Sequence, residues 1–289
     1  MDADLDLLLI AVYCTCDDLL PAKGKNAKRI LTDAEVVTLS VAQQVLRISS
    51  DEQFWAMAPH RLGHLFPRLP KRPGFVKRRQ RLSDKIEALI LEFARHTNGF
   101  DDDLLVVDST PVECGRSVET TRRSALGNAA EYGYCASHSR FFWGFRLHGL
   151  FATDGTPRAL ALTSPKTGER DVALDMLARC HRNGPVTVIG DKGYSGRDFH
   201  AQASALGATI VRPRRKDEAG KEPHLAPIRQ CVESIFWTCK DMLNLEDHRA
   251  RELHTLRTRL AAKFLALTAA IALNERLGRP PRNLTAYYA

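Results

Sequence analysis

The sequence predicts two regions of different fold class, an all-α region at the N-terminus and a mixed α/β domain after it. Apolar residues recur at helical spacing through the first 98 residues. From residue 104 onward, short apolar runs rich in β-branched residues alternate with amphipathic segments. The composition, 44% hydrophobic and 26% charged, is that of a globular protein and excludes intrinsic disorder. We therefore expect a helical, basic domain over residues 1–98 and an α/β domain over residues 99–289 that includes C-terminal helices.

The N-terminal region carries local signals for several helices. Apolar side chains over residues 5–12 fall at helical spacing. Thr32 followed by Glu35 is a capping-box pattern, which predicts the start of a helix. Prolines over residues 59–74 predict turns, and residues 75–96 predict an amphipathic helix.

One cationic block accounts for the formal net charge of +8. The stretch 53–83 contains no acidic residue and eight basic ones: Arg61, Arg68, Lys71, Arg72, Lys77, Arg78, Arg79 and Arg81. Without these eight, the chain would carry as many bases as acids, so the block predicts a surface that faces a polyanion. The last four fall near the expected N-terminus of helix 75–96, where cations oppose the helix dipole unless an anion binds.

The functional interpretation of this block is a DNA-binding surface, because Lys and Arg neutralise phosphates without reading the base sequence. The alternatives are a solvated face, or ion pairs with acids such as Asp101, Asp102 and Asp103. A helix-turn-helix is a further option, but the proline-rich link argues against its usual short turn.

The α/β domain is predicted from alternating strand and helix patterns. Strands are expected at residues 104–108, 141–153, 158–163, 186–191 and 208–211. Helices are expected at residues 171–182, 195–206, 228–243 and 251–277. The stretch 109–140 is polar, and aromatic residues cluster in and after it: Tyr132, Tyr134, Phe141, Phe142 and Trp143. Such aromatics can stack on a flipped base, although core packing is their commoner role.

Two aspartates, Asp108 and Asp191, each end an apolar, β-rich run. Because ligands gather beyond strand ends in α/β sheets, these carboxylates predict a site. Glu233 offers a third carboxylate on an expected helix. Arg229 lies four residues before it and Lys240 seven residues after it, so all three share one helix face.

Three carboxylates without a His or Cys cluster suit a hard, oxygen-preferring cation, Mg²⁺ or Mn²⁺. Carboxylates held close together repel one another, and a bound cation removes that repulsion. Two ions roughly 4 Å apart can activate an attacking oxygen and stabilise a leaving oxygen in phosphoryl transfer. The pattern therefore predicts a two-metal site at Asp108, Asp191 and Glu233.

The sequence resembles the DDE transposases of bacterial insertion sequences. Three motifs carry the resemblance: Leu-Val-Val-Asp108-Ser-Thr-Pro, Gly190-Asp191-Lys-Gly-Tyr194 and Arg229-x3-Glu233-x6-Lys240. Residues 144–148 and 168–171 also resemble family landmarks. The resemblance implies a ribonuclease-H-like mixed sheet flanked by helices, with the two aspartates and the glutamate as catalytic metal ligands. It departs at Ala226, where many members have a tyrosine thought to assist DNA strand handling, so a hairpin intermediate is left open.

The resemblance also implies DNA contacts. We expect Arg229, Lys240 and Lys192 to contact the DNA backbone near the site. Arg146 and His148 lie two residues apart on one expected strand and share a face, so they could touch phosphate. The alternative for this pair is a buried Arg–carboxylate ion pair and a core histidine.

The activity implied is that of a transposase, which hydrolyses phosphodiesters at transposon ends and transfers the freed strands into target DNA. Its partners would be double-stranded DNA, both terminal inverted repeats and target, and a second copy of the chain in a homodimeric synaptic complex. One alternative is a nuclease of the same fold that does not join strands. The other is a non-enzymatic DNA-binding regulator on a degenerate catalytic scaffold.

No membrane or export segment is predicted. The apolar run at residues 264–273 is far shorter than the ~20 residues of a membrane span, and the apolar stretch at 5–16 lacks a basic flank. The seven cysteines, an odd number without a Cys-x-x-Cys motif, argue against a zinc site or a disulfide framework. We expect a cytoplasmic, nucleoid-associated bacterial protein.

Overall fold

A computed structural model describes residues 3–21, 30–135, 139–214, 225 and 234–288. Contacts divide the chain into two compact units, a helical unit (Met1–Arg95 with Thr238–Ala289) and an α/β unit (His96–Trp237). The sequence had placed the C-terminal helices with the α/β domain, whereas these contacts assign Thr238–Ala289 to the helical unit. In the part of the chain described, no helix is both long and apolar enough to cross a membrane.

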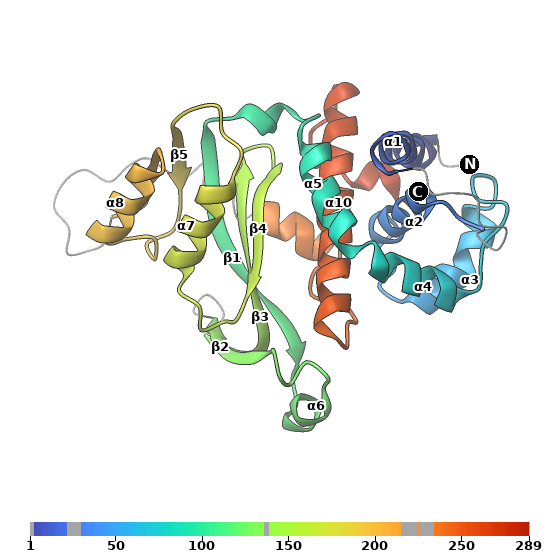
Figure 1. The fold of residues 1–289 in the computed structure, drawn as a ribbon, viewed down its shortest axis with the longest axis horizontal. Coiled ribbons are helices and arrows are strands. Elements are labelled where there is room, and N and C mark those ends of the chain that lie inside the picture. Colours follow the sequence, from blue (N-terminus) through green and yellow to red (C-terminus); the bar gives the residue numbers. More distant parts are fainter. Residues whose placement is uncertain (1–2, 22–29, 136–138, 215–224, 226–233, 289) are drawn as a thin grey trace. The chain divides into compact units, whose positions relative to one another are not determined.

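The helical unit contains these elements (Figure 1): α1 (Ala3–Leu19), α2 (Asp33–Val45), α3 (Asp51–Arg61), α4 (Arg72–Arg81), α5 (Ser83–Ala94), a π-helix (Thr238–Met242), α10 (Leu253–Arg276) and a 3₁₀ turn (Thr285–Tyr287). Helix α10 lies at the centre, because it is buried nearly all round from Leu256 to Asn274 and packs mainly on α5 and α2. The expected capping box is present. The Thr32 hydroxyl accepts from the Glu35 amide at 3.1 Å, and the Glu35 carboxylate accepts from the Thr32 amide.

The prediction of a single helix over residues 75–96 is wrong, because the structure has two helices there, α4 and α5, which meet at Leu82. Pro73 lies in the first turn of α4, where its missing amide costs no helical hydrogen bond, so the helix begins at Arg72. The cations predicted at a helix N-terminus therefore lie further along, with Arg78, Arg79 and Arg81 in the last turn of α4. There the helix dipole favours positive charge.

The α/β unit is built on one six-stranded mixed sheet. Its strands are β1 (Leu104–Gly115), β2 (Glu131–Cys135), β3 (Arg140–Ala152), β4 (Pro157–Thr163), β5 (Val186–Ile189) and β6 (Ala208–Val211). The order is β2-β3-β1-β5-β6, with β4 also on β3. Strands β1 to β4 pair antiparallel, whereas β1, β5 and β6 are parallel. This is the ribonuclease-H-like sheet that the sequence predicted.

Helices cover this sheet and fill its connections: a 3₁₀ turn (Asn98–Asp101), α6 (Val118–Arg123), α7 (Glu169–Arg179) and α8 (Arg197–Ala205). The polar stretch 109–140 is more regular than predicted, since β1 runs on to Gly115 and α6 and β2 follow. Strand β1 continues past Asp108 because its alternate residues Thr110 and Val112 are buried and pair with β3.

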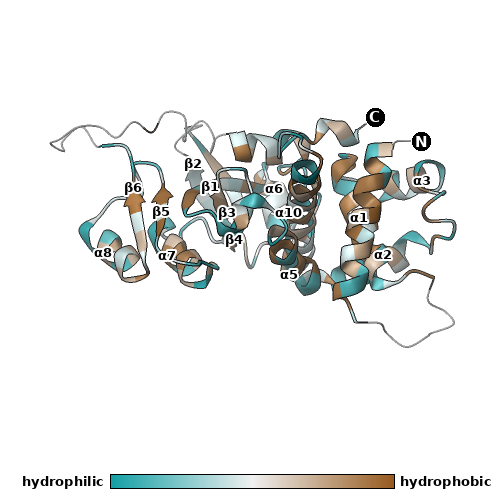
Figure 2. Ribbon diagram, turned by 90° about the horizontal axis from the view of Figure 1, so that it is seen from above, coloured by the Kyte–Doolittle hydropathy of each residue, from teal (hydrophilic) through white to brown (hydrophobic). Residues whose placement is uncertain are grey.

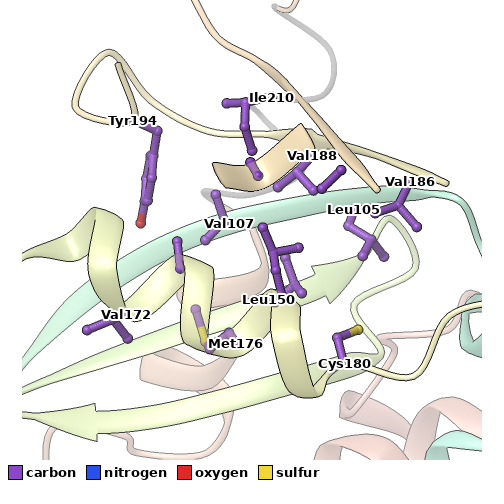
Figure 3. Close-up of a cluster of buried hydrophobic side chains, with 14 of the residues drawn as sticks. Leu105, Val107, Leu150, Val172, Met176, Cys180, Val186, Val188, Tyr194 and Ile210 are labelled. Carbon is purple, nitrogen blue, oxygen red and sulfur yellow. The ribbon is translucent and has the colours of Figure 1, made fainter. Parts of the chain in front are cut away.

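A single apolar cluster joins α7 and α8 to one face of the sheet (Figure 3). Leu105 and Val107 of β1, Leu150 of β3 and Val188 of β5 contribute from the strands, and Met176 contributes from α7. Strands β5 and β6 are mainly hydrophobic (Figure 2), as the buried parallel strands of an α/β sheet usually are. This packing fixes the carboxyl ends of β1 and β5 relative to each other.

Candidate active site

Asp108 and Asp191 occupy equivalent positions relative to two neighbouring parallel strands, Asp108 within β1 and Asp191 in the loop after β5. The last register pair between β1 and β5 joins Val106 to Ile189, and each aspartate lies two residues further along the chain. Neighbouring strands are about 4.8 Å apart. The structure therefore brings both predicted aspartates to the same edge of the sheet.

Backbone amides hold the two carboxylates in a similar way. The Ser109 amide donates to Oδ1 of Asp108 at 2.7 Å, and the Gly193 amide donates to Oδ1 of Asp191 at 2.7 Å. A Cβ atom on Gly193 would lie 2.9 Å from Oδ1 of Asp191, so a larger residue there would require this carboxylate to shift. Asp191 is exposed to solvent, which leaves its carboxylate open to a ligand.

Tyr194 is buried beneath this edge, and its ring reaches from the loop after β5 toward the apolar cluster (Figure 3). Burial raises the pKa of its phenol well above the ordinary value, and the charges of Glu169, Asp108 and Asp191 raise the pKa further. Its hydroxyl has no hydrogen-bond partner within the described ranges. The phenol therefore stays protonated at neutral pH and is a poor nucleophile.

Arg146 forms an ion pair with Glu169, at the first position of α7. Its guanidinium also donates to Ser109 Oγ at 3.1 Å and to the Tyr134 carbonyl at 3.0 Å. The side chain is only 14% exposed. The structure thus shows a partly buried Arg–carboxylate pair, as the alternative for Arg146 expected, and the DNA contact predicted for Arg146 stays a prediction. The sequence had noted the motif containing Glu169 without assigning this residue a role.

His148 is a core histidine. It is fully buried and hydrogen-bonds to Thr163 Oγ1 at 3.0 Å. Burial, with a smaller contribution from Arg146, lowers the pKa of its imidazole to about 4. The ring is therefore neutral at physiological pH and offers no charge to a phosphate.

The third predicted carboxylate, Glu233, lies outside the described residues, as do Arg229 and Ala226. Residues 234–237 are helical, and Phe236 packs edge-on against Phe151 with ring centroids 5.6 Å apart. Phe151 pairs with Val106, two residues before Asp108, so it lies on the same sheet face as the Asp108 side chain. The described end of this helix thus covers the face of the sheet that carries the first aspartate.

The remaining predicted DNA contacts near the site differ in their surroundings. Lys192 follows Asp191 directly and is exposed. Lys240 belongs to the helical unit, where its ammonium pairs with Glu246 at 3.3 Å.

The cationic block divides into buried and exposed members. Arg79 is 1% exposed and donates to both carboxylate oxygens of Asp51 at 3.0 Å and to Gln43 at 2.7 Å. Arg78 pairs with the buried Asp33. As placed, these two arginines help to hold the helical unit together. Arg79 is buried, whereas the Arg78 side chain is 24% exposed, and the DNA contacts predicted for both stay predictions. The partners of these arginines lie on α2 and α3, not among the acids that the sequence had suggested.

Lys77 and Arg81 remain exposed on α4 and keep the predicted character of a cationic surface.

The aromatic cluster also divides into buried and exposed members. Phe142 and Trp143 are buried, whereas Tyr132, Tyr134 and Phe141 are 55%, 48% and 75% exposed. Core packing therefore explains Phe142 and Trp143 but not the three exposed rings.

Within the described ranges, no three His, Cys, Asp or Glu side chains are grouped closely enough to hold a metal ion. The described residues contribute two of the three predicted carboxylates, those of Asp108 and Asp191.

A family model described as a transposase DDE domain matches residues 99–269. The match begins where the sequence predicted the α/β domain and extends into α10, so it spans parts of both compact units. No curated protein and no solved structure matches the chain significantly.

Proposed function

Because the chain belongs to the DDE transposase family, we propose that it is a metal-dependent enzyme that cleaves DNA at transposon ends and joins the freed ends to target DNA. One observation supports this most directly. Asp108 and Asp191 each lie two residues beyond the last residue pair that joins β1 to β5. Carboxylates at such matching positions are suited to share a ligand.

The donor set fits a divalent cation such as the family uses. Carboxylate oxygens are the preferred ligands of hard cations. Oδ1 of Asp191 accepts one amide hydrogen bond, and Oδ2 accepts none within the described part of the chain. We propose Asp108, Asp191 and Glu233 as the residues that would hold Mg²⁺ or Mn²⁺, and two bound ions as the occupancy. A bound divalent cation lowers the pKa of an attacking water and offsets charge on the scissile phosphate.

The chain's own contribution is to position these groups and to leave the attack to water. The Ser109 and Gly193 amides fix the carboxylates before DNA binds. Tyr194 is buried and protonated, so it does not compete as a nucleophile. With water as the nucleophile, the proposed reaction forms no covalent bond between the protein and the DNA.

Two displacements follow at one site. A water oxygen bonds to the phosphorus at the transposon end, and the bond from phosphorus to the 3′ oxygen breaks. The leaving 3′ oxygen takes up one proton, and the second proton of the water is released to solvent. The freed 3′ hydroxyl then bonds to a target phosphorus, and the target strand's own P–O bond to its 3′ oxygen breaks. Each step replaces one P–O bond with another.

DNA would be held by several cationic groups outside the carboxylates. The exposed Lys77 and Arg81 support this role on α4, and Lys192 supports it beside Asp191. Arg229 and Lys240 are proposed from the motif around Glu233. We further propose that the enzyme originates from a bacterial insertion sequence, that it acts as a homodimer on paired terminal repeats, and that it works in the cytoplasm on nucleoid DNA.

The test compares wild type with Asp108→Asn and Asp191→Asn on a plasmid that carries the DNA flanking the gene. Both variants keep the side-chain shape but lose the charge, so strand cleavage and strand transfer should fall below detection, while DNA binding remains. Asp175→Asn is the matched control, because this acid is 67% exposed and pairs only with Arg179 on the outside of α7 within the described residues. Full cleavage by Asp191→Asn would contradict the proposal.

A further inference from the structure

A cationic cleft lies beside the proposed active site, within the α/β unit. Its volume is about 610 Å³, and its lining residues come from the start of α7, the loop after β5, the first turns of α8 and the end of β6: Arg170, Gly193, Ser195, Gly196, Arg197, His200 and Arg212. The cleft therefore opens at the carboxyl edge of the parallel strands, where Asp191 also lies. Ligands of α/β sheets bind at this edge.

The charge of the cleft is one-sided. Among the described residues that line it, three are arginines and one is a histidine, and none is acidic. Glu169, the neighbour of Arg170, does not offset them, because it pairs with Arg146. Arg197 is exposed and makes no hydrogen bond or ion pair with the described residues. Cations held around one cleft repel one another unless an anion lies between them.

The backbone of the cleft is built for close approach. Gly196 has φ +132°, which other residues rarely adopt, and a Cβ atom there would lie 2.9 Å from the Arg170 guanidinium. That guanidinium donates to the Ser195 carbonyl at 2.8 Å and is thereby fixed at the rim. Helix α8 begins at Arg197 without a side-chain cap, and Asp198 in its first turn offsets part of the positive potential of the N-terminal amides, so the arginines supply most of the positive charge of the cleft.

Gly193 connects the cleft to the carboxylates, because it lines the cleft while its amide donates to Asp191. We propose that this cleft binds the sugar–phosphate backbone of the DNA strand on the α8 side of the scissile phosphate. The cleft would thereby set which phosphodiester reaches Asp108 and Asp191. This assignment rests on the proposed function.

The lining favours a nucleic-acid backbone over a free nucleotide. Arginine recognises phosphate through its planar fork of donors, and three arginines serve more than one phosphate. No Phe, Tyr or Trp lines the cleft as a platform for a base. The surface is therefore suited to contacts that do not depend on sequence.

The experiment measures binding of a fluorescent double-stranded oligonucleotide of arbitrary sequence, without divalent metal, over a series of salt concentrations. Arg197→Gln should lower affinity about tenfold and reduce the slope of log affinity against log salt by about one, as loss of one phosphate contact predicts. Arg197→Lys should restore the slope, since it keeps the charge. Arg170 is left intact because it supports the Ser195 carbonyl.

Arg179→Gln is the matched control. It removes the same charge from an exposed position on α7, nine residues and about 13 Å along that helix from the cleft residue Arg170. Affinity and slope should match wild type. If Arg197→Gln also matches wild type, the inference is overturned.

A second arm adds inorganic phosphate or a deoxynucleoside triphosphate. If either binds wild type but not Arg197→Gln, while the DNA salt slope is the same in both proteins, the cleft serves a free phosphate and the inference is again overturned. These readings are independent of catalysis. If Arg197→Gln reduces the salt slope but the wild type never cleaves DNA, the cleft assignment stands and the proposed function is refuted. If the wild type cleaves DNA but Arg197→Gln leaves the slope unchanged, the proposed function stands and the cleft assignment is refuted.

Discussion

Replacing Arg79 with alanine should destabilise the helical unit and should not act primarily on DNA binding. The guanidinium is 1% exposed and makes three hydrogen bonds, two to Asp51 and one to Gln43. Loss of one partner from a buried ion pair costs about 3–5 kcal/mol. Asp51 would keep Arg259 as a partner at 2.8 Å, so we expect the lower end, about 3 kcal/mol.

Urea denaturation measures this effect. With a dependence of about 2 kcal/mol per molar urea, the midpoint of the helical unit should fall by about 1.5 M. Trp55 is a local probe, since its ring stacks on Phe75 at 4.6 Å and Phe75 also lies under the Arg79 guanidinium. The matched controls are Lys77→Ala and Arg81→Ala on the same helix, which are exposed and should change stability by less than about 0.5 kcal/mol.

The two sets of variants should behave in opposite ways in a DNA titration. Lys77→Ala and Arg81→Ala should each flatten the salt dependence of binding, whereas folded Arg79→Ala should keep it. The reasoning is refuted if Arg79→Ala unfolds at the wild-type urea midpoint and flattens the salt dependence. Arg79 would then be a residue that contacts DNA and not a buried residue that stabilises the helical unit.

Three further outcomes are expected. Thr32→Ala removes the cap of α2 and should cost about 1 kcal/mol by urea denaturation. Burial lowers the pKa of Lys263 from 10.5 to about 7, so its stabilising contribution is complete only above 10.5 and is lost as pH falls through 7. Unfolding free energy should therefore rise by about 2 kcal/mol from about pH 7 to about pH 9, and Lys263→Met should abolish that rise. Because the pKa of His148 is lowered from 6.5 to about 4, stability should fall by about 3 kcal/mol as pH drops across that interval, and His148→Gln should remove this component in acid denaturation.

Local signals in the sequence predicted local structure well. The capping box at Thr32 formed as its pattern required, because both partners lie within one helical turn. The two apolar runs before Asp108 and Asp191 were predicted as strands and are strands, but the end expected for the first strand at Asp108 was wrong, because β1 continues to Gly115. The exact register of the two strands depended on the pairing of β1 with β5, which no single run contains.

Long-range pairing explains what the sequence could not predict. Arg79 has the same local surroundings as its exposed neighbours, and its burial depends on Asp51 and Arg259, 28 and 180 residues away along the chain. Arg146 likewise meets Glu169 only when β3 and α7 pack together. The same limit applies to the cleft, whose arginines come from α7, α8 and the segment after β6.

Iron-mediated cleavage of the protein backbone tests the metal site most directly. Fe²⁺ substituted for Mg²⁺, with ascorbate and peroxide, generates radicals that cut the chain next to the bound ion. If Asp108, Asp191 and Glu233 hold one metal centre, fragments should end near all three positions, excess Mg²⁺ should suppress them together, and Asp191→Asn should abolish them. Fragments that map elsewhere, or that persist unchanged in Asp191→Asn, would contradict the assignment of this centre.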